Sequence, residues 1–168
     1  MYSKYFYSAE ANELFTERQI ITEMLRFEAG LAKAQSKLGI VPEKAAEIIE
    51  NCCRVEFIDA NLLQSEIILG GNAAIPLVKQ LTRIVKNNDV DASKYVHLGA
   101  TSQDVVDTAT ALQIQKYGIW LEEKLDQLIS ILTKLTQNHR NTLMIGRTLL
   151  QQAKPITFGL KTAGWLEA

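Results

Sequence analysis

The chain has 168 residues, of which 47% are hydrophobic and 22% are charged. A chain of this length and apolar content can bury a core of ordinary size, which excludes an intrinsically disordered protein. Its 18 basic and 19 acidic residues leave a formal net charge of −1. Because this balance offers no excess positive charge to attract a polyanion, we expect neither nucleic acid nor an anionic membrane among its partners.

Cysteine usage and hydropathy indicate a reduced, cytoplasmic setting. Cys52 and Cys53 are adjacent in the sequence, so they cannot link distant segments, and no Cys/His spacing is typical of a zinc site. The amino-terminal residues lack the continuous apolar run of a signal peptide, and no segment reaches the roughly 18 apolar residues of a membrane span. No residue pattern suggests a metal or an organic cofactor, so we predict none.

Apolar residues recur at helical spacing along nearly the whole chain, which predicts an all-α protein. The first helix is expected over about 17–38, because Thr16 and Gln19 have the spacing of a capping box and Gly39 can end the helix in the left-handed conformation. One broad apolar face is predicted for this helix, made of Ile20, Ile21, Met24, Leu25, Phe27, Leu31, Ala34 and Leu38.

Two further helical segments follow. Pro42 suits the start of a short helix, and Asp59 can cap a third segment that runs towards Val85. Pro76 and two preceding glycines interrupt this third segment. Because a proline removes a helical hydrogen bond and crowds the preceding turn, we expect a break near 70–76.

A much longer helix is expected from Thr101 to about Asn138, because Thr101 and Asp104 repeat the capping-box spacing and no proline follows them in this stretch. At about 1.5 Å per residue this helix is roughly 50 Å long. It carries an apolar stripe with the spacing of a helix-bundle seam: Ile114, Leu121, Leu125, Leu128, Leu132 and Leu135. No other predicted helix is long enough to cover this stripe, so we expect another subunit or sequence outside this chain to do so.

The last part of the chain is predicted to contain a short extended connection over 143–150 and, after Pro155, a helical stretch from Thr157 to Ala168. The apolar pattern is still running at Ala168, so we expect the chain to be part of a longer protein. Within it we predict a small helical domain over about 1–95 and the start of a central helical bundle over about 96–168.

The segment from His97 to Asp104 is the first candidate for a functional site. Gly99 lets the backbone approach a ligand, and the hydroxyls of Thr101 and Ser102 stand at the amino end of the long helix, where free N–H groups and a partial positive charge favour anions. A carboxylate could bind here, with His97 as hydrogen-bond donor or proton carrier. The same residues also fit a plainer interpretation, in which Thr101 only caps the helix and His97 is an ordinary histidine.

The second candidate is the segment 146–155. Arg147 can bind a carboxylate through two parallel hydrogen bonds, and Thr148 and Gln151 add hydrogen-bonding groups beside it. The alternative is that Arg147 and Lys154 form ordinary surface ion pairs.

Taken together, these segments resemble the fumarase/aspartase superfamily of helical lyases, as its amino-terminal portion and over essentially the whole chain. The stretch 95–109, YVHLGATSQDVVDTA, looks like the first signature region, and 146–159, GRTLLQQAKPITFG, looks like the second. Within the superfamily, GATSQD, RTLLQQA and FGLKTAGWL are most similar to the 3-carboxy-cis,cis-muconate cycloisomerase branch. The adenylosuccinate lyase branch is the nearest alternative.

The resemblance implies a homotetramer whose long helices form a bundle, with active sites built from three subunits and a small polycarboxylate as substrate. In the cycloisomerase branch a substrate carboxylate adds to a double bond of the same molecule during aromatic-acid breakdown, whereas adenylosuccinate lyase releases fumarate. His97 corresponds to a substrate-contacting histidine, and Thr101 and Ser102 correspond to hydroxyls that hold a substrate carboxylate. Thr148 and Gln151 occupy matching positions in the second region.

Two departures from the superfamily pattern favour the cycloisomerase branch. Leu149 stands where many members have a histidine, and no histidine lies near Asn72, where adenylosuccinate lyases place one. Leucine cannot transfer a proton, so the ordinary acid/base pair is absent. The third signature region, a loop with a serine base, would lie beyond residue 168, so we expect this chain alone to be inactive. A non-catalytic helical oligomerisation module is the alternative from another class.

Overall fold

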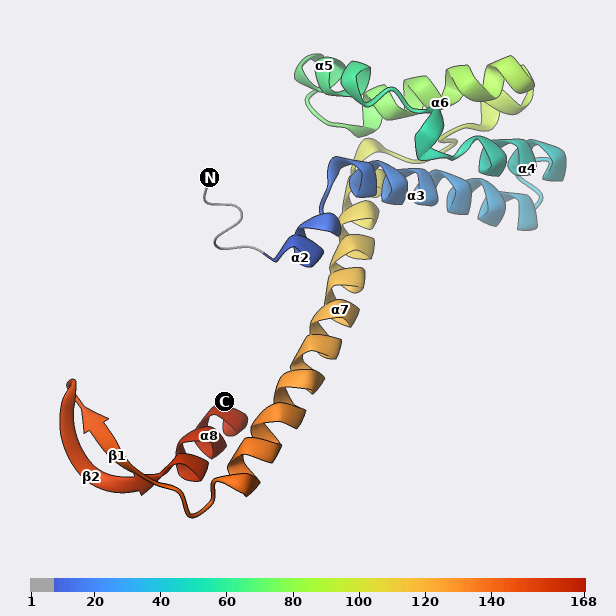
Figure 1. Cartoon of the computed structure of the whole chain (residues 1–168). Helices are drawn as coiled ribbons and strands as arrows, with labels where there is room; N and C mark the ends of the chain where they lie inside the picture. Colours follow the sequence, from blue (N-terminus) through green and yellow to red (C-terminus); the bar gives the residue numbers. More distant parts are fainter. Residues whose placement is uncertain (1–7) are drawn as a thin grey trace. The chain divides into compact units, whose positions relative to one another are not determined.

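The computed structural model describes residues 8–168 and is mostly helical, as the sequence predicts (Figure 1). In chain order the elements are α2 (Ala9–Glu13), α3 (Glu17–Lys37), α4 (Glu43–Cys52), the 3-10 turn η1 (Val55–Phe57), α5 (Ala60–Gly70), α6 (Ala74–Asn88), the 3-10 turn η2 (Ala92–Tyr95), α7 (Ser102–Asn138), β1 (Leu143–Thr148), β2 (Gln151–Thr157) and α8 (Phe158–Glu167). Across residues 8–168, none of these helices combines the length and the apolar character that a bilayer crossing needs.

The chain divides into two compact units, one ending at Tyr117 and the other beginning at Gly118, within α7. The first unit contains the helices up to α6 and the first turns of α7, and the second contains the rest of α7, the hairpin and α8. A domain boundary near residue 95 stays a prediction.

The predicted first helix is confirmed as α3. The Thr16 Oγ1 accepts a hydrogen bond from the Gln19 N–H at 3.4 Å, and Gly39 follows the helix with a φ of +72°. Leu38, which the pattern places on the buried face, is 75% exposed, because it is the C-cap residue and lies where the chain leaves the helix.

The predicted break in the third segment is also confirmed, and it separates α5 from α6. Asp59 Oδ1 accepts a hydrogen bond from the Leu62 N–H at 3.0 Å at the start of α5, and Gly71 ends that helix with a φ of +75°. Asn72 Oδ1 then accepts from the N–H groups of Ala74 and Ile75, at 3.0 and 3.2 Å. Asn72 therefore satisfies backbone donors at the start of α6, which gives this residue a structural role.

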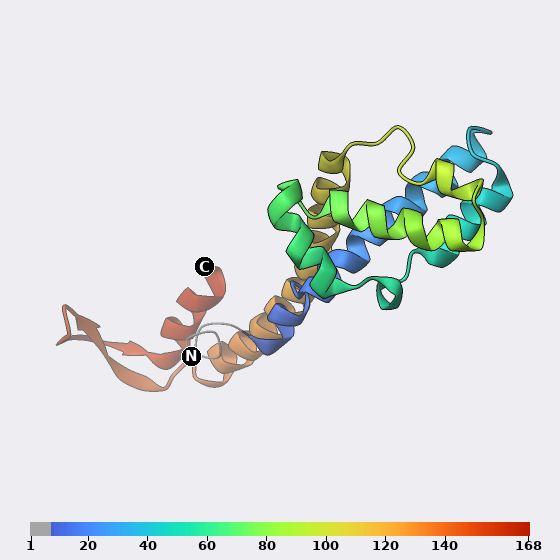
Figure 2. The ribbon, with the colours of Figure 1, turned by 90° about the horizontal axis from the view of Figure 1, so that it is seen from above.

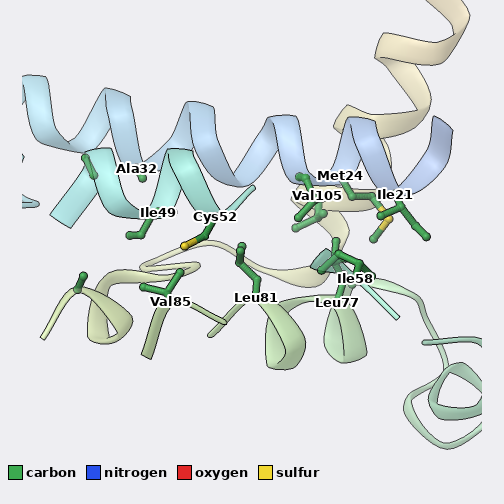
Figure 3. Packing of buried hydrophobic residues seen from close by; sticks show 14 of the residues in the cluster. Ile21, Met24, Ala32, Ile49, Cys52, Ile58, Leu77, Leu81, Val85 and Val105 are labelled. Carbon is green, nitrogen blue, oxygen red and sulfur yellow. The ribbon is translucent and has the colours of Figure 1, made fainter. Parts of the chain in front are cut away.

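The core of the first unit lies between α3, α4 and α6. α3 packs against α4, and α6 packs against α4 and α5 (Figure 2). Met24, Ile49, Leu77 and Leu81 meet in this core together with Val105 from the start of α7 (Figure 3), and each is at most 1% exposed. Burial of such side chains stabilises the fold by about 1.5–3 kcal/mol each, so the core holds the first turns of α7 in place.

In the second unit, β1 and β2 form an antiparallel hairpin (Figure 1). The extended segment predicted over 143–150 is confirmed by β1, whereas the pairing with a second strand is an addition to the predicted all-helical pattern. The two-residue turn consists of Leu149 and Leu150, with φ of +47° and +66°. Turns of this kind usually contain Asn or Gly, because a Cβ crowds the backbone at positive φ. The sequence of two leucines therefore does not predict a hairpin turn.

The hairpin is irregular at Gly146. Ile145 pairs with Pro155 and Arg147 pairs with Gln152, so Gly146 lies opposite two residues of β2. A Cβ added at Gly146 would lie 2.9 Å from the carbonyl oxygen of Lys154. A glycine is therefore required for this bulge to close.

The end of α7 and the start of α8 are in direct backbone contact. The Gly159 N–H donates to the His139 carbonyl oxygen at 2.9 Å, and a Cβ at Gly159 would lie 2.8 Å from both the Arg140 Cα and the Thr136 oxygen. The hydroxyls of Thr136 and Thr162 are 2.9 Å apart, and Thr162 is fully buried. Glycine and threonine thus allow the two helices to approach closely.

Most of the predicted apolar stripe on α7 is open to solvent. Leu121, Leu125 and Leu128 are 36%, 46% and 49% exposed, whereas Leu132 is 7% exposed. Figure 1 shows α8 beside the last turns of α7. Among residues 8–168, the stripe is therefore covered mainly near the carboxyl end of the helix.

Candidate functional site

The loop between η2 and α7 carries the first predicted site, and α3 holds it from one side. His97 has a φ of +58° and Gly99 a φ of +72°. A non-glycine residue in this conformation costs roughly 1–3 kcal/mol, so contacts around His97 must hold it there. Gln35 of α3 supplies one such contact, because its Nε2 donates to the Leu98 carbonyl oxygen at 2.7 Å.

A second contact from α3 reaches the imidazole itself. His97 Nδ1 lies 2.7 Å from Oε1 of Glu28, whose side chain is 1% exposed. Burial raises the pKa of the Glu28 carboxyl above its ordinary value, and the hydrogen bond and charge of His97 oppose this rise. The other oxygen of Glu28, Oε2, is buried and has no hydrogen-bond partner among the described residues. The loop histidine is therefore paired with a carboxyl group that water does not reach.

The charge of Glu28 also acts on Cys53, and α3 carries a second buried carboxylate. Cys53 follows α4, and burial together with the charge of Glu28 raises the pKa of its thiol to about 12. Glu23, also 1% exposed on α3, forms an ion pair with Lys116 of α7. Across residues 8–168, no group of three or more His, Cys, Asp or Glu side chains is placed to hold a metal ion.

The start of α7 differs in detail from a simple anion site. The Thr101 N–H donates to Oδ2 of Asp104 at 2.9 Å, so one helix-terminal donor is already used and a carboxylate stands next to it. Thr101 is exposed and Ser102 is half-buried. Their hydroxyls, together with His97, are the groups of this loop that can donate to a bound carboxylate.

The second predicted site lies on the hairpin. Thr148 and Gln151 are paired across the strands and flank the turn, and Arg147 is paired with Gln152. Successive strand residues face opposite sides of a ribbon, so Thr148 and Gln151 share one face and Arg147 belongs to the other. The structure therefore brings Thr148 and Gln151 together but not Arg147 with them.

Arg147 contributes to a groove of about 520 Å³ between the hairpin and α8. Met144, Ile145, Ile156 and Leu160 form its apolar lining, and Lys161 is the second cation beside it. Within the described part of the chain, neither Arg147 nor Lys154 forms an ion pair, so the predicted alternative of surface ion pairs is not observed there.

Glu28 is the site residue that sequence reasoning missed, and Glu23 is a second buried carboxylate of α3, outside the site, that it also missed. Glu28 continues the buried positions of α3, Ile21, Met24, Leu25 and Ala32, at the spacing of one helix face. A charged residue on an otherwise apolar face has to be paired, and this spacing was the available signal. The partner of Glu28 is His97, which lies in a loop 69 residues further along the chain. The pattern of α3 does not reveal this partner.

Comparison with known proteins places this fold and these loops in a family. Residues 4–168 match the model of a family described as lyase, and the chain belongs to this lyase family. The matched region is the amino-terminal portion. This agrees with the superfamily resemblance seen in the two signature-like segments.

Individual relatives show which members of this family the chain is similar to. The 3-carboxy-cis,cis-muconate cycloisomerase of Acinetobacter baylyi is 42% identical over 100% of this chain and 38% of its own length. The crystal structure of the 3-carboxy-cis,cis-muconate lactonizing enzyme of Pseudomonas putida has a TM-score of 0.95 at 40% identity, covering 99% of this chain and 38% of that one. The adenylosuccinate lyase of Methanocaldococcus jannaschii is 34% identical over 93% of this chain and 33% of its own. The chain thus spans well under half the length of these relatives.

Proposed function

We propose that the whole protein to which this chain belongs is an enzyme of the 3-carboxy-cis,cis-muconate cycloisomerase type, which forms a lactone by adding a substrate carboxylate to a double bond of the same molecule. The observation that carries this proposal is the 42% identity to a cycloisomerase over the full chain, against 34% to an adenylosuccinate lyase. Leu149 supports it, because a leucine at this position cannot serve as a proton-transferring group.

The class of substrate is a small polycarboxylate. The nitrosuccinate lyase of Streptomyces davaonensis is also 42% identical, over 87% of this chain. Nitrosuccinate carries two carboxylates and 3-carboxy-cis,cis-muconate carries three, so the shared requirement is a site that holds one carboxylate while charge develops beside another. Donors from Thr101, Ser102 and His97 suit this task, because hydrogen bonds to developing negative charge stabilise it most in a site that excludes water.

The whole protein is proposed to act as a homo-oligomer, with a tetramer formed through the long helices. The exposed leucines of α7 support this, since contiguous apolar surface on a helix is typical of an interface. In such an assembly, Thr148 and Gln151 on one face of the hairpin, or Arg147 on the other, would add further hydrogen bonds to the polycarboxylate. Residues 1–168 alone are proposed to be inactive, because the family resemblance places the serine base outside them. Sedimentation of the whole protein tests the assembly, and a monomer at micromolar concentration would refute it.

Turnover of the whole protein tests the activity. 3-Carboxy-cis,cis-muconate and adenylosuccinate are offered separately, and ultraviolet absorbance is followed in each case. We expect loss of the muconate signal only. Replacing Ser102 by alanine should lower kcat/KM by about 10- to 100-fold, the value of one hydrogen bond to a charged group. Ser93→Ala is the matched control, because the Ser93 hydroxyl donates to the Val90 carbonyl oxygen in η2 and lies outside the loop.

Other outcomes separate the alternatives. Release of fumarate from adenylosuccinate would favour the adenylosuccinate lyase type instead and would show that Leu149 is a poor guide to the branch. A stable oligomer that turns over neither compound would favour a helical oligomerisation module without chemistry. Turnover by residues 1–168 alone would contradict the proposed need for further sequence.

A further inference from the structure

We propose that Glu28 is a positioning residue for His97: it keeps one proton within the Nδ1···Oε1 hydrogen bond and so makes Nε2 the nitrogen that exchanges a proton and meets the substrate. The part that concerns the substrate rests on the proposed function. The assignment of the ring nitrogens stands on the contacts of α3 with the loop alone.

The geometry requires a proton between the two atoms. They lie 2.7 Å apart, and the Glu28 side chain is 1% exposed. Without a proton, the lone pairs of Nδ1 and Oε1 would face each other at this distance in a site with little water to separate them. The contact is therefore a hydrogen bond that contains one proton, whichever of the two atoms carries it.

A second proton, added to the His97–Glu28 pair, has one suitable place. A proton on Oε2 of Glu28 would be buried without an acceptor, because that oxygen has no partner among the described residues. Cys53, whose thiol pKa is raised to about 12 by burial and by the charges around it, stays a neutral thiol and supplies no proton near neutrality. The proton that the pair gains or loses is thus the one on Nε2.

This arrangement fixes the chemistry that His97 can offer. With the extra proton, Nε2–H donates to a carboxylate, and without it Nε2 is an acceptor. A neutral imidazole in water prefers to carry its proton on Nε2, whereas the pair with Glu28 forces it onto Nδ1. The two tautomers have opposite donor and acceptor sides, so the proposal makes a spectroscopic prediction that does not depend on any substrate.

The sequence provides a clean experiment, because it contains two histidines. His139 serves as the internal reference, since its Nδ1 faces the Thr142 hydroxyl at 3.2 Å and not a carboxylate. The chain is labelled with ¹⁵N-histidine, and two-bond ¹H–¹⁵N spectra are recorded over a range of alkaline pH, at which the chemical shifts identify the tautomer of each ring. We expect His97 to be protonated at Nδ1 and bare at Nε2.

Variants on α3 sharpen the test. Glu28→Met removes the acceptor at similar volume and should return His97 to the tautomer preferred in water. Glu28→Gln keeps an acceptor oxygen and should preserve the Nδ1–H form. Glu23→Met is the matched control, because it removes an equally buried carboxylate of α3 whose partners are Lys116 and Arg26, and it should leave the His97 spectrum unchanged.

Two results would overturn the proposal: an Nε2-protonated His97 in the unmodified chain, or the same His97 tautomer before and after Glu28→Met. If Glu28→Met does not fold, the spectrum of the unmodified chain decides alone. In the whole protein, Glu28→Met should lower kcat about 10-fold with a smaller change in KM, and Glu28→Gln should restore part of it. Absence of turnover together with the expected tautomer would refute the proposed function and leave the role of Glu28 intact.

Discussion

Replacing Gly159 by alanine should loosen the attachment of α8 to the end of α7. The new Cβ would lie within 2.9 Å of three backbone atoms, the Arg140 Cα and the carbonyl oxygens of Thr136 and His139. Backbone atoms cannot move aside as a flexible side chain can, so one helix must shift. Overpacking of this kind costs roughly 1–3 kcal/mol.

Gly164 provides the matched control in the same helix. A Cβ added there meets no atom within 4 Å. Gly164→Ala should therefore show only the helix-propensity gain of alanine, about 1 kcal/mol. Because both variants carry the same substitution in α8, the helix-propensity gain cancels, and the difference between them, about 1–3 kcal/mol, measures the cost of the close approach.

Amide hydrogen exchange of residues 158–167 is the suitable assay, because the effect is local to the second unit. Each 1.4 kcal/mol changes protection about tenfold, so Gly159→Ala should exchange about 5- to 150-fold faster than Gly164→Ala. The Gly159 amide itself, which donates to the His139 oxygen, should lose most of its protection. Equal protection in the two variants would refute the argument that backbone contact at Gly159 fixes α8.

Further predictions concern the thiol, the hairpin turn and a helix glycine. The folded chain keeps the Cys53 proton up to a pKa of about 12, whereas the ordinary value is 9.0. Above about pH 9 the unfolded state therefore binds fewer protons, and the free energy of unfolding falls with rising pH, by up to about 2 kcal/mol at pH ~10.5. Urea titrations at pH ~8 and ~10.5 should show a smaller fall for Cys53→Ala. The double variant Leu149→Asn, Leu150→Gly relieves positive φ at two leucines. It should stabilise the hairpin by about 1–2 kcal/mol per residue relieved, which is measured as slower amide exchange over 143–157. Gly30→Ala adds a Cβ with no atom within 4 Å and should raise the thermal midpoint of the first unit, since it favours α3 by about 1 kcal/mol; an unchanged or lower midpoint would show a hidden packing role for Gly30.

The helices of the first unit were predictable because their boundaries depend on local chemistry. Thr16 accepts from a backbone N–H three residues later, Asp59 does the same, and Gly71 ends α5 in the left-handed conformation. Each of these interactions lies within a few residues of sequence. Local spacing therefore suffices to place α3, α5 and the break before α6.

The hairpin and the histidine pair depend on information that local spacing does not contain. Leu149 and Leu150 adopt a conformation that leucine disfavours, so the turn contradicts residue preference and has to be held by the strands around it. Glu28 and His97 are separated by 69 residues, and only the packing of α3 against the loop brings them together. A carboxylate on an apolar face indicates that some partner exists, but the fold decides which one.

The two buried carboxylates of α3 also constrain the order in which the first unit can form. Glu23 is paired with Lys116 as well as with Arg26, and Glu28 is paired with His97; Lys116 and His97 lie 93 and 69 residues further along the chain. If α3 and α4 packed together first, Glu28 would be desolvated without its partner, and Glu23 would keep only its 3.5 Å contact with Arg26 of the same helix, at a cost of several kcal/mol. A stable α3–α4 pair therefore has to wait for long loops to close, which couples early and late parts of the chain in one cooperative transition and slows folding relative to a bundle of local helix pairs.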